Sequence, residues 1–292
     1  MEKESRILLD NSIIILQSAI EQFRPQCPDE YKKAILTLYE NTHDLLDQNF
    51  INQIQSDFPS RLAELVFSCA FRFALGLKPE HKSDAGPDLW LNSIGAWAEI
   101  VTATDGDPSN LNSLNPGEEN EDKKLLRFTN AIAAKTAKFS KDIHENRVNP
   151  SDKLIICIYP WVTNWLPCYP ANGLPDIVRA VYPAGDYQLL LNKSTEAIEN
   201  HQYSFRDVIQ KRKADGSIAS IYTNTFLNVQ NSHITGVLFS PNPGNFLNHS
   251  EIGSDFIFVH NALAENKVLP GELNVGEEYR AELSIQKYLN RI

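Results

Sequence analysis

The apolar stretch KLIICIYP, residues 153–160, constrains the fold most. It is short, uninterrupted and bounded by turn residues, as a strand buried in the centre of a sheet would be. Upstream of it, the spacing of apolar residues predicts a helix over 60–76, strands at 88–92 and 96–102, and an amphipathic helix over 124–146. This order of helix, strand, strand, helix and strand predicts an α/β fold.

The flanking segments extend this core on both sides. Residues 7–23 and 29–55 show helical spacing, and we expect an N-terminal helical extension over 1–57. Ser60 is the expected N-cap of the next helix, which should end at Gly76. The remainder predicts a C-terminal β-rich elaboration, with a short helix at 174–183, strands at 186–194, 233–240 and 255–263, and a hairpin over 205–227 that turns at Asp-Gly.

No clear linker interrupts this alternation. We therefore expect residues 58–292 to form one elaborated domain, with its core at 58–160. The long polar loop from Asp105 to Glu121 is expected to be mobile and able to close over a substrate.

Composition narrows the class of protein. No apolar run approaches the ~18 residues of a membrane span, the first residues lack the layout of a secretory signal, and the four cysteines are scattered. No membrane partner is therefore expected. Because Cys69 and Cys157 lie in apolar runs, we expect buried thiols and a cytoplasmic protein. The net charge of −10 disfavours non-specific attraction to nucleic acid but leaves room for a local basic groove.

Glu99 is the residue that most needs an explanation. It is the only charged residue in the apolar run 96–103, where it shares one face of the strand with Trp97 and Val101. A buried lone carboxylate costs several kcal/mol, so a functional site explains Glu99 better than an exposed strand face. Asp88 precedes the neighbouring strand, and Glu64 lies on the largely apolar helix before it.

Three carboxylates that converge in one groove repel one another unless a cation neutralises them. Hard oxygen ligands suit Mg²⁺, or Mn²⁺ in its place, and such an ion can activate water and stabilise the charge that builds on a phosphodiester. On the helix over 124–146, basic residues share one face, so that Lys135 could reach the acids: Arg127, Lys135 and Lys138. Leu125, Phe128, Ile132 and Phe139 line the opposite face.

These motifs resemble the PD-(D/E)xK superfamily of nucleases, whose restriction-endonuclease-like core runs helix, three strands, helix, strand. The stretches GPD with Asp88 and AEIV with Glu99 carry the resemblance, and other stretches look like those of uncharacterised bacterial proteins built around this core. The resemblance implies a central mixed sheet flanked by helices, a metal held by Asp88 and Glu99, and assistance from Glu64. The family's lysine position is Val101 here, so Lys135 would be its substitute on the following helix, and Arg127 and Lys138 would contact phosphate.

Two functions follow from these expectations. The first is a Mg²⁺-dependent phosphodiesterase that acts on DNA or RNA. The second is a nuclease-like fold without catalysis, which serves as a binding or interaction module; Val101 and the net charge favour it. A hydrolase that uses two carboxylates on another substrate is a weaker third. The N-terminal helices offer a surface for a homodimer.

Each candidate also has a purely structural explanation. Asp88 after Pro87 is typical turn chemistry, and Glu64 could simply pair with a nearby arginine. Lys135 and Lys138 could belong to a solvated helix face. The histidines are isolated, and no closely spaced His and Cys residues suggest zinc.

Overall fold

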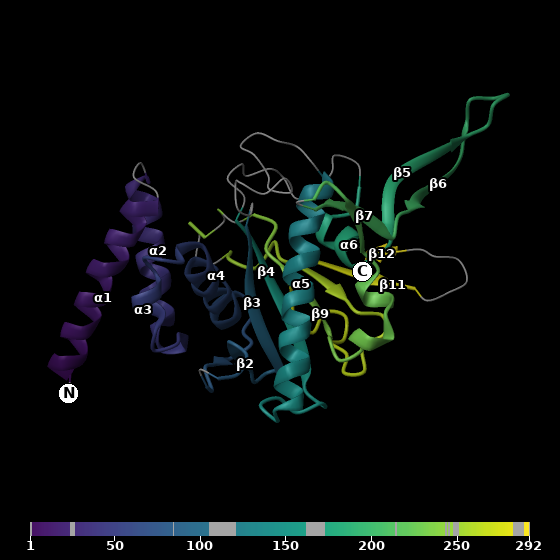
Figure 1. Cartoon of the computed structure of the whole chain (residues 1–292). Helices are drawn as coiled ribbons and strands as arrows, with labels where there is room; N and C mark the ends of the chain where they lie inside the picture. Colours follow the sequence, from purple (N-terminus) through teal and green to yellow (C-terminus); the bar gives the residue numbers. More distant parts are fainter. Residues whose placement is uncertain are drawn as a thin grey trace.

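A mixed β-sheet with helices on both faces forms the centre of the protein, which confirms the α/β prediction (Figure 1). The structure is a computed structural model. It describes residues 2–23, 27–83, 85–104, 121–161, 173–213, 215–242, 244, 246–247, 251–282 and 289–291.

Within these residues, eight strands form the sheet in the order β1 (Pro79–Glu80), β2 (Leu89–Leu91), β3 (Ala96–Thr104), β4 (Lys153–Trp161), β9 (Gly236–Phe239), β10 (Ile257–His260), β11 (Glu277–Ala281) and β12 (Leu289–Arg291). The strands β3, β4 and β9 run parallel, whereas β1, β2 and β3 form an antiparallel meander. The predicted apolar strand 153–160 is therefore central, and its residues from Leu154 to Pro160 are buried.

Two apolar cores lie on the two faces of the sheet, and β3 contributes to both. Ala96, Ala98 and Ile100 pack on the side of α1 (Glu2–Phe23), α2 (Asp29–Thr42), α3 (Phe50–Gln53) and α4 (Phe58–Cys69). Trp97 and Ala103 pack on the side of α5 (Glu121–His144) and α6 (Asp176–Val181). This alternation follows from the period of two along a strand. It places residue 99 on the α5 side.

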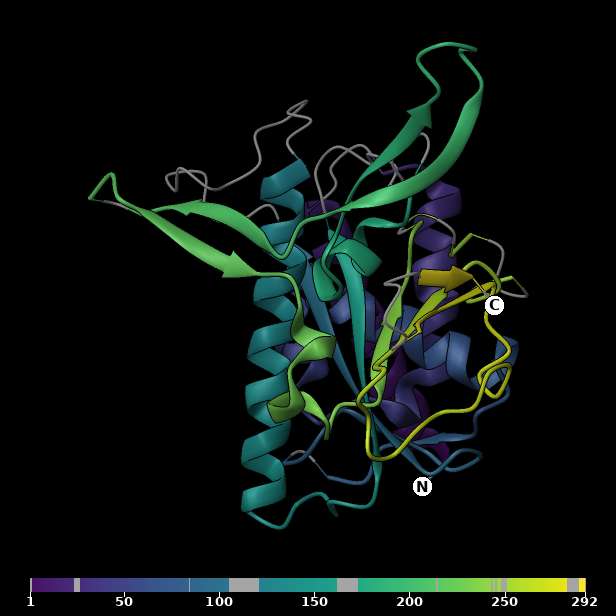
Figure 2. The same cartoon turned by 90° about the vertical axis from the view of Figure 1, so that its right-hand side faces the viewer.

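Two β-hairpins project from the body of the protein (Figure 2). The first consists of β5 (Ala184–Leu191) and β6 (Ile198–Phe205), and the second of β7 (Val208–Arg212) and β8 (Ile218–Tyr222). The second hairpin was predicted together with its Asp-Gly turn, and Gly216 adopts the positive φ of 80° that such a turn favours. The strands β6, β11 and β12 were not predicted.

Two helix predictions need correction. The expected helix 29–55 ends at Thr42, a 3₁₀ turn (His43–Leu45) follows, and α3 is a separate short helix. The carboxylate of Asp47 accepts from the backbone N–H of Asn49 at 2.7 Å, a local turn that competes with a continuous helix. The next helix begins at Phe58 instead of at a Ser60 cap, because Pro59 fits the first helical turn.

The same helix changes near its end. It continues through a π-helical turn (Ala70–Ala74), and a glycine with positive φ, Gly76, follows as predicted. The remaining short 3₁₀ helices are Thr225–Leu227 and Val229–Asn231.

Other expectations have mixed outcomes. Cys69 and Cys157 are buried, as predicted, and so is Cys27. No helix in the described parts of the chain has the length and apolarity needed to cross a bilayer. The loop residues 105–120 and Cys168 lie outside the described residues. The homodimer and the domain limits stay predictions.

Candidate functional site

Glu99 lies on β3 facing α5, where two lysines bind its carboxylate. The Nζ atom of Lys135 is 2.6 Å from Glu99 Oε1, and that of Lys138 is 2.5 Å from Oε2. Glu99 is 1% exposed, whereas the side chains of Lys135 and Lys138 are 23% and 35% exposed. Both lysines project from α5, whose opposite face of Leu125, Phe128, Ile132 and Phe139 is buried as predicted. The prediction that Lys135 reaches Glu99 is confirmed.

Asp88 lies beside this ion-pair cluster, at the start of β2. The register pairs Leu89 with Ala98, so Asp88 falls opposite Glu99, and its Oδ2 accepts from the Ile100 N–H at 2.6 Å. Burial raises the pKa of Asp88 to about 6, the Glu99 carboxylate adds to the rise, and Lys135 opposes it. The charges of the two carboxylates therefore interact across β3.

The turn before Asp88 also contacts the two lysines' ion-pair cluster, through Lys138. Lys138 Nζ donates to the backbone oxygen of Gly86 at 3.2 Å, and the ring of His81 is 3.2 Å from the backbone oxygen of Asp88. Burial disfavours the charged form of Lys135, but Glu99 and then Asp88 outweigh it and raise the pKa of Lys135. Lys135 is therefore an ammonium group at neutral pH.

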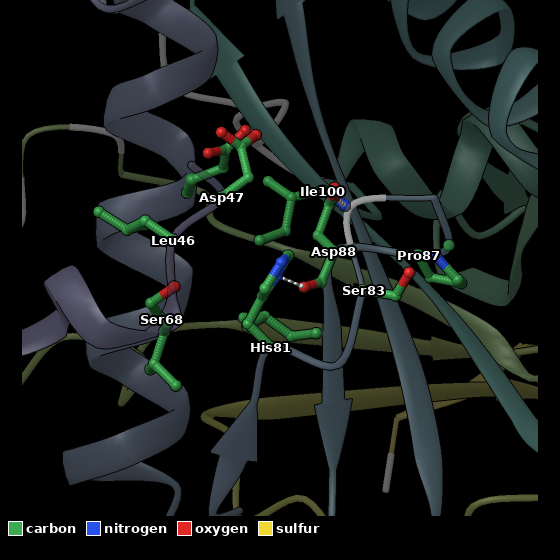
Figure 3. Close-up of a pocket in the computed structure, with 12 residues that line it drawn as sticks. Leu46, Asp47, Ser68, His81, Ser83, Pro87, Asp88 and Ile100 are labelled. Atoms are coloured by element: carbon green, nitrogen blue, oxygen red, sulfur yellow. Dashed lines mark hydrogen bonds between the residues drawn. The ribbon is translucent and has the colours of Figure 1, made fainter. Parts of the chain in front are cut away.

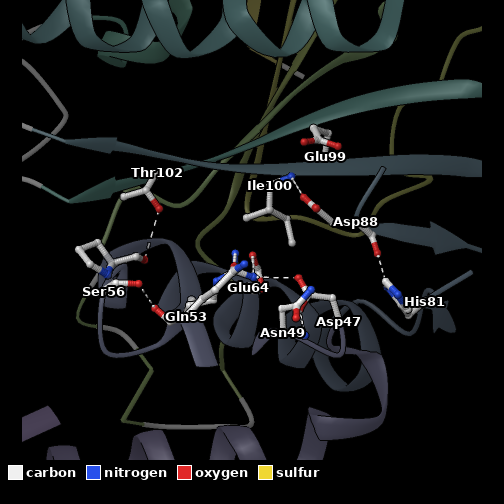
Figure 4. Close-up of polar contacts among 12 residues, drawn as sticks. Asp47, Asn49, Gln53, Ser56, Glu64, His81, Asp88, Glu99, Ile100 and Thr102 are labelled. Atoms are coloured by element: carbon white, nitrogen blue, oxygen red, sulfur yellow. Dashed lines mark hydrogen bonds and ion pairs between the residues drawn. The ribbon is translucent and has the colours of Figure 1, made fainter. Parts of the chain in front are cut away.

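Glu64 lies across the strand from Glu99, which corrects one expectation (Figure 4). The three carboxylates do not meet in one groove, because Glu64 projects from α4 on the other face of the sheet, and Asp88 stands between Glu64 and Glu99. Arg61 Nη1 binds Glu64 at 2.9 Å and Asp47 at 3.1 Å. The alternative of an arginine partner for Glu64 is thus correct.

Burial nevertheless raises the pKa of Glu64 to about 8, against the opposing charge of Arg61, and Asp88 adds to the rise. Glu64 and Asp88 line a small cavity of about 40 Å³, together with Asp47, Ser68 and His81 (Figure 3). Figure 3 shows Asp47 and Ser68 on one wall and Asp88 and His81 on the other.

Asp47 and His81 were missed from the sequence. Asp47 follows the helix break described above, and His81 lies in the irregular segment that carries β1, so neither has a periodic context that points to a site. Arg127, by contrast, lies on α5 as predicted and is partly buried, and its contact with phosphate stays a prediction.

The carboxylate oxygens of Asp88 and Glu99 are hard donors of the kind that suit a divalent cation, and the positive charges of Lys135 and Lys138 oppose its binding. Within the described residues, no three His, Cys, Asp or Glu side chains are gathered as a metal-binding group. Mg²⁺ is commonly held by only one or two carboxylates, with water and substrate phosphate at its other positions. Lys138, the more exposed of the two ammonium groups on Glu99, is the one with which a cation would compete.

Comparison with known proteins adds no relative. No family model, no curated protein and no solved structure matches this chain significantly. The site and the order of the elements around it are therefore the features that bear on function.

Proposed function

We propose that this protein is a metal-dependent phosphodiester hydrolase, a nuclease with a core of the PD-(D/E)xK type. The single observation that carries the proposal is the 2.6 Å contact between Lys135 and Glu99, with Asp88 beside them. It supports the relocation of the essential lysine from residue 101 to the following helix. The element order α4, β1, β2, β3, α5, β4 further supports it, because the superfamily core runs helix, three strands, helix, strand.

Each residue then has a role set by its surroundings. Asp88 and Glu99 would hold Mg²⁺ or Mn²⁺, which when bound would lower the pKa of water and offset charge on the phosphate. Lys135, held as an ammonium, orients the attacking water and stabilises the negative charge of the transition state. Glu64 fixes Arg61 and supports the cavity below Asp88. Arg127 and Lys138 contact the phosphate backbone.

Cleavage assays with matched variants on one helix test the proposal. Plasmid DNA and single-stranded RNA are incubated with the protein in Mg²⁺ or Mn²⁺, beside Lys135→Met and Lys141→Met. Lys141 also lies on α5 and is 66% exposed, and its ion pair within the described residues, with Glu145, is long at 4.0 Å, so its removal should leave the site intact. We expect Lys135→Met to lower the rate at least ~100-fold, the usual cost of removing a charge-stabilising donor. Equal cleavage by both variants would refute the proposal.

Calorimetry with Mn²⁺ tests the metal site without a substrate. Lys138→Met removes the ammonium that occupies Glu99 Oε2, so this variant should bind Mn²⁺ more tightly than the natural chain. Adding Asp88→Asn should abolish that binding. A Lys138→Met variant that releases no heat with Mn²⁺ contradicts the assignment of Asp88 and Glu99 as ligands.

One observation favours the second candidate, a nuclease-like fold that binds without hydrolysis. Both oxygens of Glu99 are already paired with ammonium groups, so the carboxylate is neutralised without a metal. This candidate predicts nucleic-acid binding that neither Mg²⁺ nor Lys135→Met changes, and no cleavage under any condition.

A further inference from the structure

We propose that the β7–β8 hairpin is the duplex-DNA-binding element of this protein and enters the major groove. The proposal rests on the proposed function only in that it names the substrate of that hydrolase as double-stranded DNA. The hairpin leaves the body beside α5, the helix that carries Lys135 and Lys138, and it extends past that helix into solvent (Figure 2).

The register of the hairpin separates its two faces. Val208 pairs with Tyr222, Gln210 with Ser220 and Arg212 with Ile218, without a bulge, so these six residues share one face. Tyr222 and Ile218 are 62% and 64% exposed, and this face therefore has no partner large enough to bury it among the described residues. The opposite face is anchored by the buried Ile209.

Positive charge is concentrated at the far end of the hairpin. Lys211, Arg212 and Lys213 are consecutive in a chain whose net charge is −10. Lys211 and Lys213 form no ion pair with any described residue, in contrast to Arg206 at the base, which is bound to Glu121 and Asp122. Such charge attracts a polyanion.

The other hairpin lacks this property. From Ala184 to Phe205 it carries one lysine against three acids, Asp186, Glu196 and Glu199, whereas the three basic residues of the β7–β8 hairpin face one acid, Asp215. A phosphate backbone would be repelled there, which singles out β7–β8 as the polyanion-binding hairpin.

The shape and chemistry of the exposed face select duplex DNA. The major groove of B-DNA is about 12 Å wide and admits a two-stranded ribbon, whereas the major groove of A-form RNA is too deep and narrow. Gln210 and Ser220 supply the donors and acceptors that read base edges, and Ile218 is suited to contact thymine methyl groups. Five paired positions at ~3.3 Å each give roughly 16 Å of ribbon. Lys211 and Lys213 then meet the flanking phosphates.

Fluorescence anisotropy tests the proposal with metal removed by EDTA, so that cleavage cannot interfere. A labelled 20-base-pair DNA duplex and the matching RNA duplex are titrated with the full chain, with Lys211→Ala/Lys213→Ala, and with the control Lys33→Ala/Lys193→Ala. The control removes two exposed lysines from other surfaces. Circular dichroism confirms that each variant is folded.

We expect the natural chain to prefer the DNA duplex. The Lys211→Ala/Lys213→Ala variant should bind it roughly 10- to 60-fold more weakly at 0.1 M salt, with the slope of log K against log salt reduced by about 2. The control should bind like the natural chain. Equal loss in both variants, equal affinity for the RNA duplex, or no binding of the natural chain to duplex DNA would each overturn the proposal.

The two proposals fail separately. DNA binding that depends on Lys211 and Lys213, without cleavage in Mg²⁺ or Mn²⁺, refutes the proposed hydrolase activity and supports the role of the β7–β8 hairpin. The opposite result is cleavage that depends on Lys135, with both cleavage and DNA binding unchanged in Lys211→Ala/Lys213→Ala. It refutes the role of the β7–β8 hairpin and supports the hydrolase activity.

Discussion

Replacing Glu99 by glutamine tests whether the ion-pair cluster is integral to the folded state. The change keeps the shape of the side chain but removes the charge that both Lys135 and Lys138 contact at 2.6 and 2.5 Å. Hydrogen bonds to charged groups contribute about 1.5–3 kcal/mol each, and breaking a buried pair costs about 3–5 kcal/mol. Because the lysines are partly exposed and can turn to water, we expect a loss near the lower end, about 3 kcal/mol.

Urea unfolding followed by circular dichroism measures this loss of free energy, and thermal unfolding gives a second measure. For a chain of this length about 1 kcal/mol corresponds to roughly 2 °C, so the Tm should fall by ~6 °C. The matched control is Glu272→Gln, which removes an equally short 2.6 Å contact with Lys153 from a site that is 25% exposed, and it should cost about 1 kcal/mol or less. Equal losses in the two variants would refute the argument from burial.

An apolar replacement of the whole cluster distinguishes stability from function. Buried ion pairs are often no more stabilising than well-packed apolar groups of similar volume. The triple variant Glu99→Leu/Lys135→Met/Lys138→Met should therefore unfold at a higher urea concentration than Glu99→Gln while lacking activity. A triple variant less stable than Glu99→Gln would contradict this explanation.

Three further predictions concern other parts of the chain. Gly236→Ala in β9 should cost about 1–3 kcal/mol in urea unfolding, because its Cβ would lie 2.5 Å from a Phe258 ring atom and 2.7 Å from the backbone oxygen of Val259; no loss would contradict this close packing. Glu64→Gln should lose less stability than the natural chain between pH 5 and pH 8, by about 3 kcal/mol. The reason is that a raised native pKa, about 8 here, makes the folded state bind protons more tightly than the unfolded state, and this stability is lost as pH rises; parallel pH profiles would contradict it. Arg179→Met should destabilise by about 3 kcal/mol, since Arg179 is 3% exposed and binds Glu121 at 2.7 Å, and a thermal shift below 2 °C would contradict that.

The sequence predicted the parts of the fold that depend on local periodicity. The strand from Lys153 and the amphipathic helix of Lys135 have periods that only one regular structure satisfies. The same periodicity placed Lys135 and Lys138 on one face of that helix. Alternation along the strand did not settle where Glu99 points, and its buried site was inferred from its apolar neighbours instead. The contact between Lys135 and Glu99 could be predicted because a buried carboxylate requires a positive partner, and the basic face of this helix supplies one.

What failed depends on contacts between distant segments. The spacing around Glu64 shows that it lies on a helix, but not which face of the sheet that helix covers, so its separation from Glu99 was not foreseen. The break after Thr42 depends on polar turn contacts that helical spacing does not report. The strand β6 was missed because its residues, from Ile198 to Phe205, are exposed or partly exposed, and exposed strands lack the apolar signal.

The cluster described at β3 has a consequence for electroneutrality. The cluster brings together two carboxylates, Asp88 and Glu99, and two ammonium groups, Lys135 and Lys138, so its formal charges already balance. A divalent ion that arrives alone leaves an excess of two positive charges, whereas one accompanied by a phosphodiester leaves only one. In the proposed hydrolase, ion and substrate should consequently bind with positive cooperativity, each raising the affinity of the other by the same factor.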